Sequence, residues 1–407
     1  MGRAPVLLAF LLHLLFLLGR VRCAAAAAAA AALGCSSPPS TDGVCARLIR
    51  PLGYPCSEHT IETEDGYLLS VQHIPHGRRA LGKTSGPPVF LQHGLFQGGD
   101  TWFMNSVEES LGFILADSGF DVWVGNVRGT RWSYGHVTLS ENDKAFWDWS
   151  WQELAQYDLL AMIGYVYSTT NSKIFYVGHS QGTIMALAAF TMPNVVRMIE
   201  SAALLCPISY LDHISSSFVL RAVGLHLDQL LLTIGIHQLN FRSDMGIQIL
   251  DSVCDGHMDC NNLLAAITGE NCCFNVSRID YYLEYEPHPS STKNLNHLFQ
   301  MIRSGTFAKY DHGWLQNVIH YGHLHPPAFD LAKIPDSLPI WMGYGGSDAL
   351  ADVADVRRTI NELRSKPELL YIDKYGHIDF IMSVKAKDDV YGNLIRFFRS
   401  QGWSSSY

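Results

Sequence analysis

Charged residues are scarce in this sequence, and those present are not concentrated in any one segment. The 407 residues include 29 Lys and Arg and 38 Asp and Glu, which gives a formal net charge of −9 without a basic stripe. Such a distribution disfavours nucleic acid as a partner. Internal repeats of roughly 20–50 residues are also absent, and the one low-complexity tract is Ala24–Ala32. With 48% hydrophobic residues, the chain can build one large core and an inserted second layer.

Long apolar runs are lacking after the N-terminus. At the N-terminus itself, Arg3 precedes the apolar stretch Pro5–Leu18, and Cys23-Ala24-Ala25 supplies small residues for cleavage. This pattern predicts a signal peptide over residues 1–23, followed by a linker rich in Ala, Ser and Pro over 24–45. An uncleaved membrane anchor is the alternative, because the alanines could extend the run toward the ~20 residues that a spanning helix needs.

The mature chain is expected to have no membrane span. No later segment reaches about 18 uninterrupted apolar residues. The export signal predicts entry into the secretory pathway, with the cell exterior or a vacuole or lysosome as the destination. We expect a monomer.

The cysteine count agrees with export. Removal of Cys23 leaves an even set, which in an exported chain favours disulfides over metal. The eight remaining cysteines are Cys35, Cys45, Cys56, Cys206, Cys254, Cys260, Cys272 and Cys273. We predict a Cys45–Cys56 bridge and one bridge within Cys254–Cys273, whereas Cys206 is expected to be buried and free.

Two short Cys and His groupings allow a metal as an alternative. The spacing within Cys254–Cys260 and within His320–His325 is compatible with zinc ligands. A disulfide loop and a hydrogen-bonded loop are the favoured interpretations for these two segments. We therefore expect no metal site and no cofactor.

Apolar strands alternate with helical segments along most of the chain. The Asp65-Gly66 turn predicts a hairpin near the start. Strands are then expected at Pro88–Gln92, Asp121–Asn126, Lys173–Val177, Ala202–Cys206, Pro339–Gly343 and Leu369–Asp373. Helices are expected at Val107–Ser118, Trp151–Ser168, Gln181–Phe190, Asp352–Ser365 and Lys385–Gln401. This alternation predicts an α/β fold with a mostly parallel central sheet and helices on both faces.

The alternation stops over residues 210–325, where the pattern is helical. We interpret this segment as an inserted cap or lid between two parts of the core, residues 46–209 and 326–407. It would cover the carboxyl ends of the strands, where active sites of open parallel sheets lie. The apolar residues of Ser217–Phe241 fit either core-facing cap helices or a lid that opens onto lipid.

The motif with the clearest chemical meaning is Gly178-His179-Ser180-Gln181-Gly182. It follows an expected strand and precedes an expected helix, which is the context that the G-x-S-x-G pattern requires. The two glycines allow a strained turn and close backbone approach. Ser180 is therefore predicted to be a nucleophile at the edge of the sheet.

A serine nucleophile needs a base, and the base needs an acid to orient it. In this strand–turn–helix context the chain order is Ser, then Asp or Glu, then His. Asp348 and His377 each follow an apolar strand and a turn, in that order, so they are the predicted partners. Asp352 is interpreted as the N-cap of the helix that follows it, and Asp379 as a residue that could equally cap the last helix.

The reaction also needs donors for a developing oxyanion. The backbone N–H of Gln181 is one expected donor, because it lies at the positive end of its helix. Leu95, in the loop after an earlier strand, is the other, with Gly94 allowing the close turn. His93 and His179 are expected to be structural hydrogen-bonding residues.

Together these motifs resemble the acid lipases, which are the gastric and lysosomal lipases of animals and their plant counterparts. The resemblance spans roughly Gly53 to the C-terminus. It rests on His-Gly-Leu at 93–95, Asp-Val-Trp-Val-Gly-Asn at 121–126, Gly-His-Ser-Gln-Gly at 178–182, Gly-Gly-Ser-Asp at 345–348 and His-Ile-Asp-Phe at 377–380. The cap cysteines differ in number and spacing from the animal enzymes, and Cys35, Cys45 and Cys56 resemble the plant branch.

The resemblance implies an α/β-hydrolase fold with a helical cap and a movable lid. It also implies hydrolysis of neutral lipid esters at a lipid–water interface, with triacylglycerols as the expected substrates, through Ser180, Asp348, His377 and the amides of Leu95 and Gln181. A sterol-ester hydrolase or an acyltransferase with the same triad is the alternative, and a lipid carrier on a hydrolase fold is the non-enzymatic one. Asn275, in an Asn-Val-Ser sequence, is a predicted glycosylation site.

Overall fold

A mostly parallel sheet of nine strands forms the centre of the molecule in the computed structural model, which describes residues 43–78, 86–253 and 263–402. Its order is β1-β2-β4-β3-β6-β7-β10-β11, and β5 pairs with β2. The hairpin β1–β2 and the β2–β4 pair are antiparallel, whereas the strands from β4 to β11 run parallel. The sheet strands are β1 (Ser57–Glu62), β2 (Tyr67–Ile74), β3 (Pro88–Gln92), β4 (Asp121–Gly125), β5 (Gly135–His136), β6 (Ile174–His179), β7 (Ile199–Leu205), β10 (Ile340–Gly345) and β11 (Glu368–Ile372).

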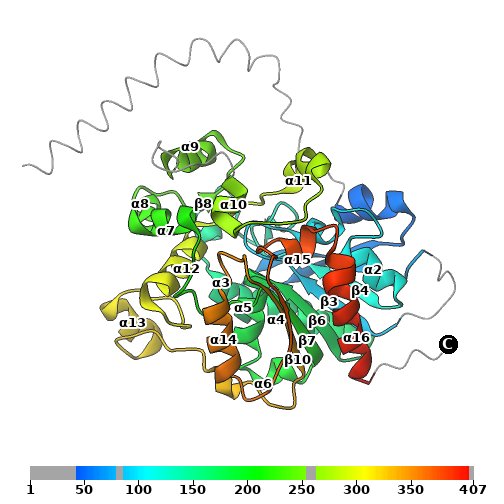
Figure 1. The fold of residues 1–407 in the computed structure, drawn as a ribbon. Coiled ribbons are helices and arrows are strands. Elements are labelled where there is room, and N and C mark those ends of the chain that lie inside the picture. Colours follow the sequence, from blue (N-terminus) through cyan, green and yellow to red (C-terminus); the bar gives the residue numbers. More distant parts are fainter. Residues whose placement is uncertain (1–42, 79–85, 254–262, 403–407) are drawn as a thin grey trace, which may run out of the picture. The chain divides into compact units, whose positions relative to one another are not determined.

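Helices cover both faces of this sheet, so its central strands read as continuous buried runs (Figure 1). One face carries α3 (Trp151–Glu153), α4 (Leu159–Thr170), α5 (Gln181–Ala189) and α14 (Val353–Glu362). The other carries α2 (Leu111–Asp117) and α16 (Gly392–Ser400). The core also contains two short helices, α6 (Pro193–Val196) and α15 (Asp379–Met382). Its single helical turns are η1 (Cys45–Ile49), η2 (Arg50–Leu52), η3 (Gly99–Phe103), η4 (Lys144–Trp147), η5 (Leu154–Asp158), η7 (Leu331–Lys333) and η8 (Lys387–Tyr391).

The chain between β7 and η7 forms a separate group of helices. Its elements are α7 (Ser217–Gly224), α8 (Leu227–Thr233), β8 (Gln238–Leu239), α9 (Asp244–Val253), α10 (Leu263–Thr268), η6 (Val276–Arg278), α11 (Ile279–Tyr285), β9 (Ser290–Ser291), α12 (Thr292–Ser304) and α13 (Trp314–Tyr321). The helices α7 to α11 lie at the top of Figure 1, near the end of the sheet where α5 begins, and α12 and α13 continue down its left side. We call this segment the cap.

The expected order of strands and helices is confirmed, with shifts of a few residues at most element ends. The fold is therefore the expected α/β architecture. In the part of the chain that the structure describes, no helix has the length and apolar character needed to cross a membrane. The predicted signal peptide and most of the predicted linker lie outside the described residues.

Candidate active site

Ser180 lies on a strained turn between β6 and α5. Its backbone has φ 53° and ψ −117°, a conformation that L-residues rarely adopt. The neighbouring glycines are required by close contact. A Cβ on Gly178 would lie 2.9 Å from the backbone carbon of Gly182, and one on Gly182 would lie 2.5 Å from the backbone oxygen of Gln92. The motif thus folds as its glycines predict and lifts the serine side chain above the sheet edge.

The side chains of Ser180, His377 and Asp348 form one continuous chain of hydrogen bonds. His377 Nε2 lies 2.7 Å from Ser180 Oγ, and His377 Nδ1 lies 3.0 and 2.9 Å from the two carboxylate oxygens of Asp348. Asp348 follows β10 and His377 follows β11, so adjacent parallel strands deliver the acid and the base to one edge. A carboxylate accepts only, so Nδ1 holds the proton and Nε2 can accept one from the hydroxyl.

Asp348 is held as an anion in a buried position. Burial alone would raise the pKa of its carboxyl, but His377 and the amides of Leu350 and Ala351 bring that pKa below its usual range. These amides donate to Oδ1 at 2.9 and 2.8 Å. Ser180, His377 and Asp348 are each at most 7% exposed. The three side chains therefore meet in a site that is shielded from bulk water.

The loop after β3 packs directly against Ser180. A Cβ on Gly94 would lie 2.9 Å from Ser180 Cβ, so only glycine allows this approach. Gln97 stabilises the loop, because its Oε1 accepts a hydrogen bond from the Gly94 amide at 2.9 Å. The structure thus brings the segment that contains Leu95 next to the serine and to the start of α5, where Gln181 lies.

His93 and His179 both make the structural hydrogen bonds expected of them. His93 Nδ1 faces the Gly94 carbonyl at 2.9 Å, and its Nε2 accepts from the Val127 amide at 3.2 Å. Burial lowers the pKa of His93 to about 4 and that of His179 to about 3, so both rings are neutral at pH 7. His179 Nδ1 lies 3.0 Å from Gln97 Oε1 and its Nε2 lies 3.0 Å from the backbone oxygen of His377, and the single N–H of the neutral ring can donate to one of these two oxygens.

One contact from the cap to the site has no counterpart in the sequence motifs. Asn294, near the start of α12, donates through Nδ2 to the side-chain oxygen of Gln181 at 2.8 Å. Both side chains are buried. The two residues lie 113 positions apart, and no short pattern around Asn294 indicates the pairing.

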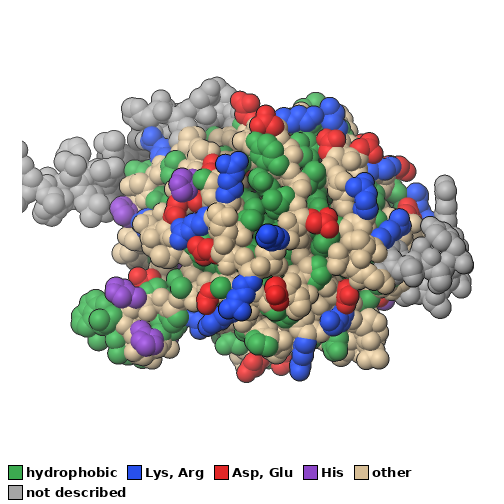
Figure 2. Space-filling model, turned by 60° about the horizontal axis from the view of Figure 1, so that its bottom comes forward, with side chains coloured by type: hydrophobic (Ala, Val, Ile, Leu, Met, Phe, Trp, Pro, Cys, Tyr) green, Lys and Arg blue, Asp and Glu red, His purple; other side chains and the backbone are tan. Residues whose placement is uncertain are grey.

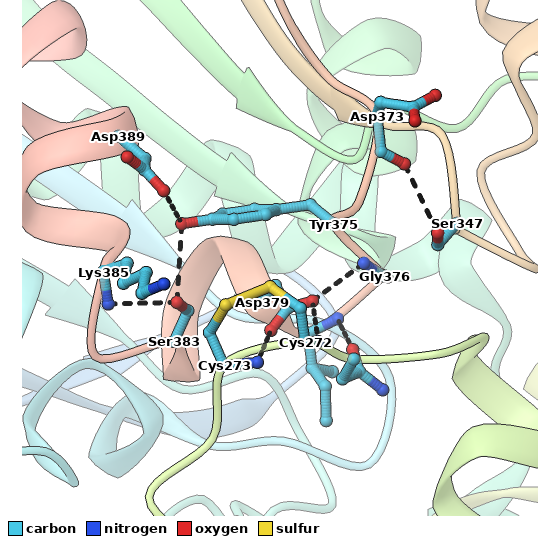
Figure 3. Close-up of a disulfide and its surroundings, with 12 residues drawn as sticks. Cys272, Cys273, Ser347, Asp373, Tyr375, Gly376, Asp379, Ser383, Lys385 and Asp389 are labelled. Atoms are coloured by element: carbon cyan, nitrogen blue, oxygen red, sulfur yellow. Dashed lines mark hydrogen bonds between the residues drawn. A yellow bond between two sulfur atoms is a disulfide. The ribbon is translucent and has the colours of Figure 1, made fainter.

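The other acidic residues near the motifs have different partners. Asp352 caps α14 as expected, because its side chain accepts from the Ala354 amide at 2.7 Å. Asp379 does not cap the last helix. Its carboxylate instead accepts backbone hydrogen bonds from Gly376, Cys272 and Cys273 (Figure 3). The expectation that Asp379 caps the last helix was wrong because two of its three partners, the Cys272 and Cys273 amides, come from the cap, which no local pattern connects to this loop.

The cysteine predictions are confirmed where the structure describes the residues. Cys45 and Cys56 form a disulfide, as do the adjacent Cys272 and Cys273, which is a bridge within the expected segment (Figure 3). Cys206 is free and buried, and its thiol donates to the backbone oxygen of His377 at 3.1 Å. The remaining cysteines, Cys35, Cys254 and Cys260, lie outside the described residues.

Two further sites singled out in the sequence are the His320–His325 segment and Asn275. Within residues 43–78, 86–253 and 263–402, none of the His, Cys, Asp and Glu groups close enough to hold a metal includes His320, His323 or His325. Asn275 is partly exposed, and Ser277 donates to its side-chain oxygen through both its amide and its hydroxyl.

A parallel sheet covered on both faces, a serine on a strained strand–helix turn and a helical insertion above it together define an α/β-hydrolase. Comparison with known proteins agrees with this class. Residues 87–383 match the alpha/beta hydrolase fold family, and residues 45–106 match the partial alpha/beta-hydrolase lipase region. A soluble variant of monoglyceride lipase from Saccharomyces cerevisiae aligns with 85% of this chain and 97% of its own, with a TM-score of 0.53 and 12% identity, which supports the fold.

Curated relatives identify the family more narrowly. "Triacylglycerol lipase 1" of Arabidopsis thaliana is 62% identical over 368 residues, which cover 90% of this chain and 93% of that protein. "Gastric triacylglycerol lipase" of Homo sapiens is 37% identical and covers 88% and 91% of the two chains. The chain therefore belongs to the lipases of the α/β-hydrolase fold, and the predicted family and enzyme class, a carboxylic ester hydrolase, are confirmed.

Proposed function

We propose that this lipase hydrolyses triacylglycerols at a lipid–water interface, with Ser180 as nucleophile, His377 as general base and Asp348 as the acid that orients it. The observation that carries the proposal is the unbroken series of hydrogen bonds from Ser180 Oγ through His377 to Asp348. In this series Ser180 Oγ lies 2.7 Å from His377 Nε2. We infer the substrate class from two relatives that are named as triacylglycerol lipases.

The geometry supports an acyl-enzyme mechanism. Ser180 Oγ attacks the ester carbonyl while His377 Nε2 accepts its proton, and the resulting imidazolium is stabilised by Asp348. His377 then gives this proton to the leaving alkoxide, which departs as the alcohol. A water molecule then attacks the acyl-enzyme while His377 Nε2 accepts its proton, and His377 returns that proton to Ser180 Oγ as the acyl–oxygen bond breaks and the fatty acid leaves. No cofactor is required for any of these steps.

The amides of Leu95 and Gln181 are the proposed oxyanion donors. Gln181 is the first residue of α5, so its N–H lies at the positive end of a helix. The contact between Gly94 and Ser180 holds the Leu95 segment against the serine, and the Asn294 side chain fixes that of Gln181. Each such donor is typically worth about 2.7–4 kcal/mol in the transition state.

The proposed compartment is the secretory pathway, ending outside the cell or in a vacuole or lysosome. Support comes from the N-terminal sequence pattern and from the Cys45–Cys56 disulfide, which requires an oxidising environment. Glycosylation at Asn275 belongs to the same proposal. We further propose a monomer that meets its lipid substrate without a membrane span of its own.

The test compares an emulsion of long-chain triacylglycerol with a soluble short-chain ester, at acidic and at neutral pH. Ser180→Ala is expected to lower kcat on the order of 10⁴-fold or more. Ser168→Ala, at an exposed serine in α4, is the matched control and is expected to leave kcat unchanged. Activity on the soluble ester alone would remove triacylglycerol as the substrate class and keep the proposed triad.

Three alternatives have distinct outcomes when the assay is extended with an acceptor alcohol or a sterol ester. An acyltransferase or a sterol-ester hydrolase would show turnover only when an acceptor alcohol or a sterol ester is supplied. A lipid carrier would bind the emulsion in both the parent and Ser180→Ala without hydrolysis. Any of these results would contradict the proposed activity.

A further inference from the structure

The helix α13 (Trp314–Tyr321) turns its apolar side chains toward solvent. Trp314 is 69% exposed, Leu315 56%, Val318 43% and Ile319 68%, and Leu324 in the following turn is 56% exposed. We call these five residues the α13 patch. In Figure 2, a group of hydrophobic side chains with histidines beside it lies at the lower left edge, on the side where Figure 1 shows α13.

Polar contacts on the inner side of α13 fix this orientation. Asn317 is 1% exposed, donates to Asp311 Oδ1 at 2.7 Å and to the Leu324 carbonyl at 3.0 Å, and accepts from the His312 amide at 2.9 Å. The hydroxyl of Tyr321 also points inward and donates to the Tyr310 carbonyl at 2.9 Å. Rotation of the helix would break these bonds, so the patch cannot turn into the core.

The patch is almost free of permanent charge. Residues 312–325 contain no Asp, Glu, Lys or Arg, and their only basic side chains are four histidines, His312, His320, His323 and His325. A folded protein partner normally pairs with a polar rim around an apolar centre. Exposed apolar side chains that include a tryptophan are instead typical of segments that lie at the boundary of a lipid phase.

The size of the patch also favours a lipid surface over a second copy of the chain. A stable dimer buries about 800 Å² on each partner. The side chains of one short helix expose on the order of a few hundred Å², given about 150–250 Å² for a whole aromatic side chain. A lipid surface needs no such minimum, because side chains insert individually.

We propose that the α13 patch is a lipid-contact element that holds the enzyme on the surface of a neutral-lipid phase. It lies at the C-terminal end of the cap, away from the Ser217–Phe241 segment, whose apolar residues also fit a lid. The proposal rests on the proposed function for the identity of the lipid. Its test measures binding alone, so its failure and the failure of the proposed activity remain distinguishable.

The experiment uses the full chain with Ser180→Ala, so that the lipid is not consumed. Binding to a long-chain triacylglycerol emulsion coated with phosphatidylcholine is measured by flotation. Adding Trp314→Ser and Ile319→Ser is expected to weaken partition at least about tenfold, because two apolar side chains no longer insert. Trp314→Phe is expected to retain most of the binding.

The matched control instead adds Val137→Ser and Leu369→Ser to Ser180→Ala. Val137 and Leu369 lie outside the α13 patch, and their exposed fractions are 54% and 49%. These changes are expected to alter binding less than twofold. Both sets are compared by thermal unfolding and by turnover of a soluble ester in chains that keep Ser180, and both readouts should match the parent. Equal binding of patch and control variants, or a dimer that only the patch variants lose, would overturn the proposal.

Discussion

Asp379 and Cys272 join the cap to the loop that carries His377. Asp379 Oδ2 accepts a hydrogen bond from the Cys272 amide at 3.0 Å and another from the Gly376 amide at 2.8 Å, while Oδ1 accepts from the Cys273 amide at 3.3 Å (Figure 3). Asp379 is fully buried. One carboxylate therefore connects two segments that lie more than 100 residues apart in the chain.

Asp379→Ala is expected to lower the free energy of unfolding by about 2 kcal/mol or more, because two of the three backbone N–H groups that lose their acceptor, those of Cys273 and Gly376, are buried and cost ~1–3 kcal/mol each. Urea denaturation measures this change. The paired control is Cys272→Ser with Cys273→Ser, which keeps both amides. Since a bridge between neighbours closes almost no loop, the control should cost less than about 1 kcal/mol. A larger cost in the control would show that the disulfide, not the carboxylate, holds the two segments together.

Asp348→Asn is expected to reduce kcat about 10⁴-fold while the fold remains intact. An amide at this position can donate to His377 Nδ1, which would leave the proton on Nε2 and prevent that nitrogen from accepting one from Ser180. Turnover of a soluble ester measures the effect. Asp352→Asn, at the N-cap of α14, is the control, since an asparagine also caps helices. A small loss in Asp348→Asn would mean that another group orients the base.

The parts of the site that depend on local chemistry could be predicted from the sequence. The strand–turn–helix context predicted the turn that carries Ser180, and two further strand ends predicted that Asp348 and His377 lie beside it, because parallel strands deliver their carboxyl ends to one edge. The contacts of Asp379 and Asn294 could not be predicted. Both connect the cap to the core, and that packing is decided by tertiary structure rather than by residue order.

Acidification is expected to destabilise the protein through its buried neutral histidines. Burial lowers the pKa of His297 to about 3, whereas an unfolded histidine has a pKa near 6.5. Below about pH 6.5 the unfolded chain binds more protons than the native one, so stability falls with pH by about 1.4 kcal/mol per unit for each such residue until the native pKa is reached.

Comparison of urea unfolding at pH 7 and pH 5 tests this expectation. The parent should be less stable at pH 5, and His297→Gln should reduce the difference between the two pH values by about 2 kcal/mol. His323→Gln, at an exposed histidine, is the control and should leave that difference unchanged. Equal differences in the parent and His297→Gln would show that this ring does not resist protonation.

Arg128 is expected to be a major determinant of stability, because its guanidinium is 1% exposed and bridges two carboxylates. Nε donates to Asp158 at 2.7 Å, and Nη1 and Nη2 donate to Asp65 at 2.5 and 2.8 Å. Arg128→Met removes the cation beside the fully buried Asp158, which then keeps only its hydrogen bond from the amide of residue 128, and should cost about 3–5 kcal/mol of unfolding free energy. Arg128→Lys should recover only part of this lost stability, since one ammonium cannot reproduce the planar fork between two acids.

The control is Arg396→Lys, on the exposed side of α16. It should change the free energy of unfolding by less than about 0.5 kcal/mol in the same denaturation experiment. If Arg128→Met were as stable as the parent, Asp158 would have to be protonated in the native protein, and the bridge would contribute geometry rather than charge.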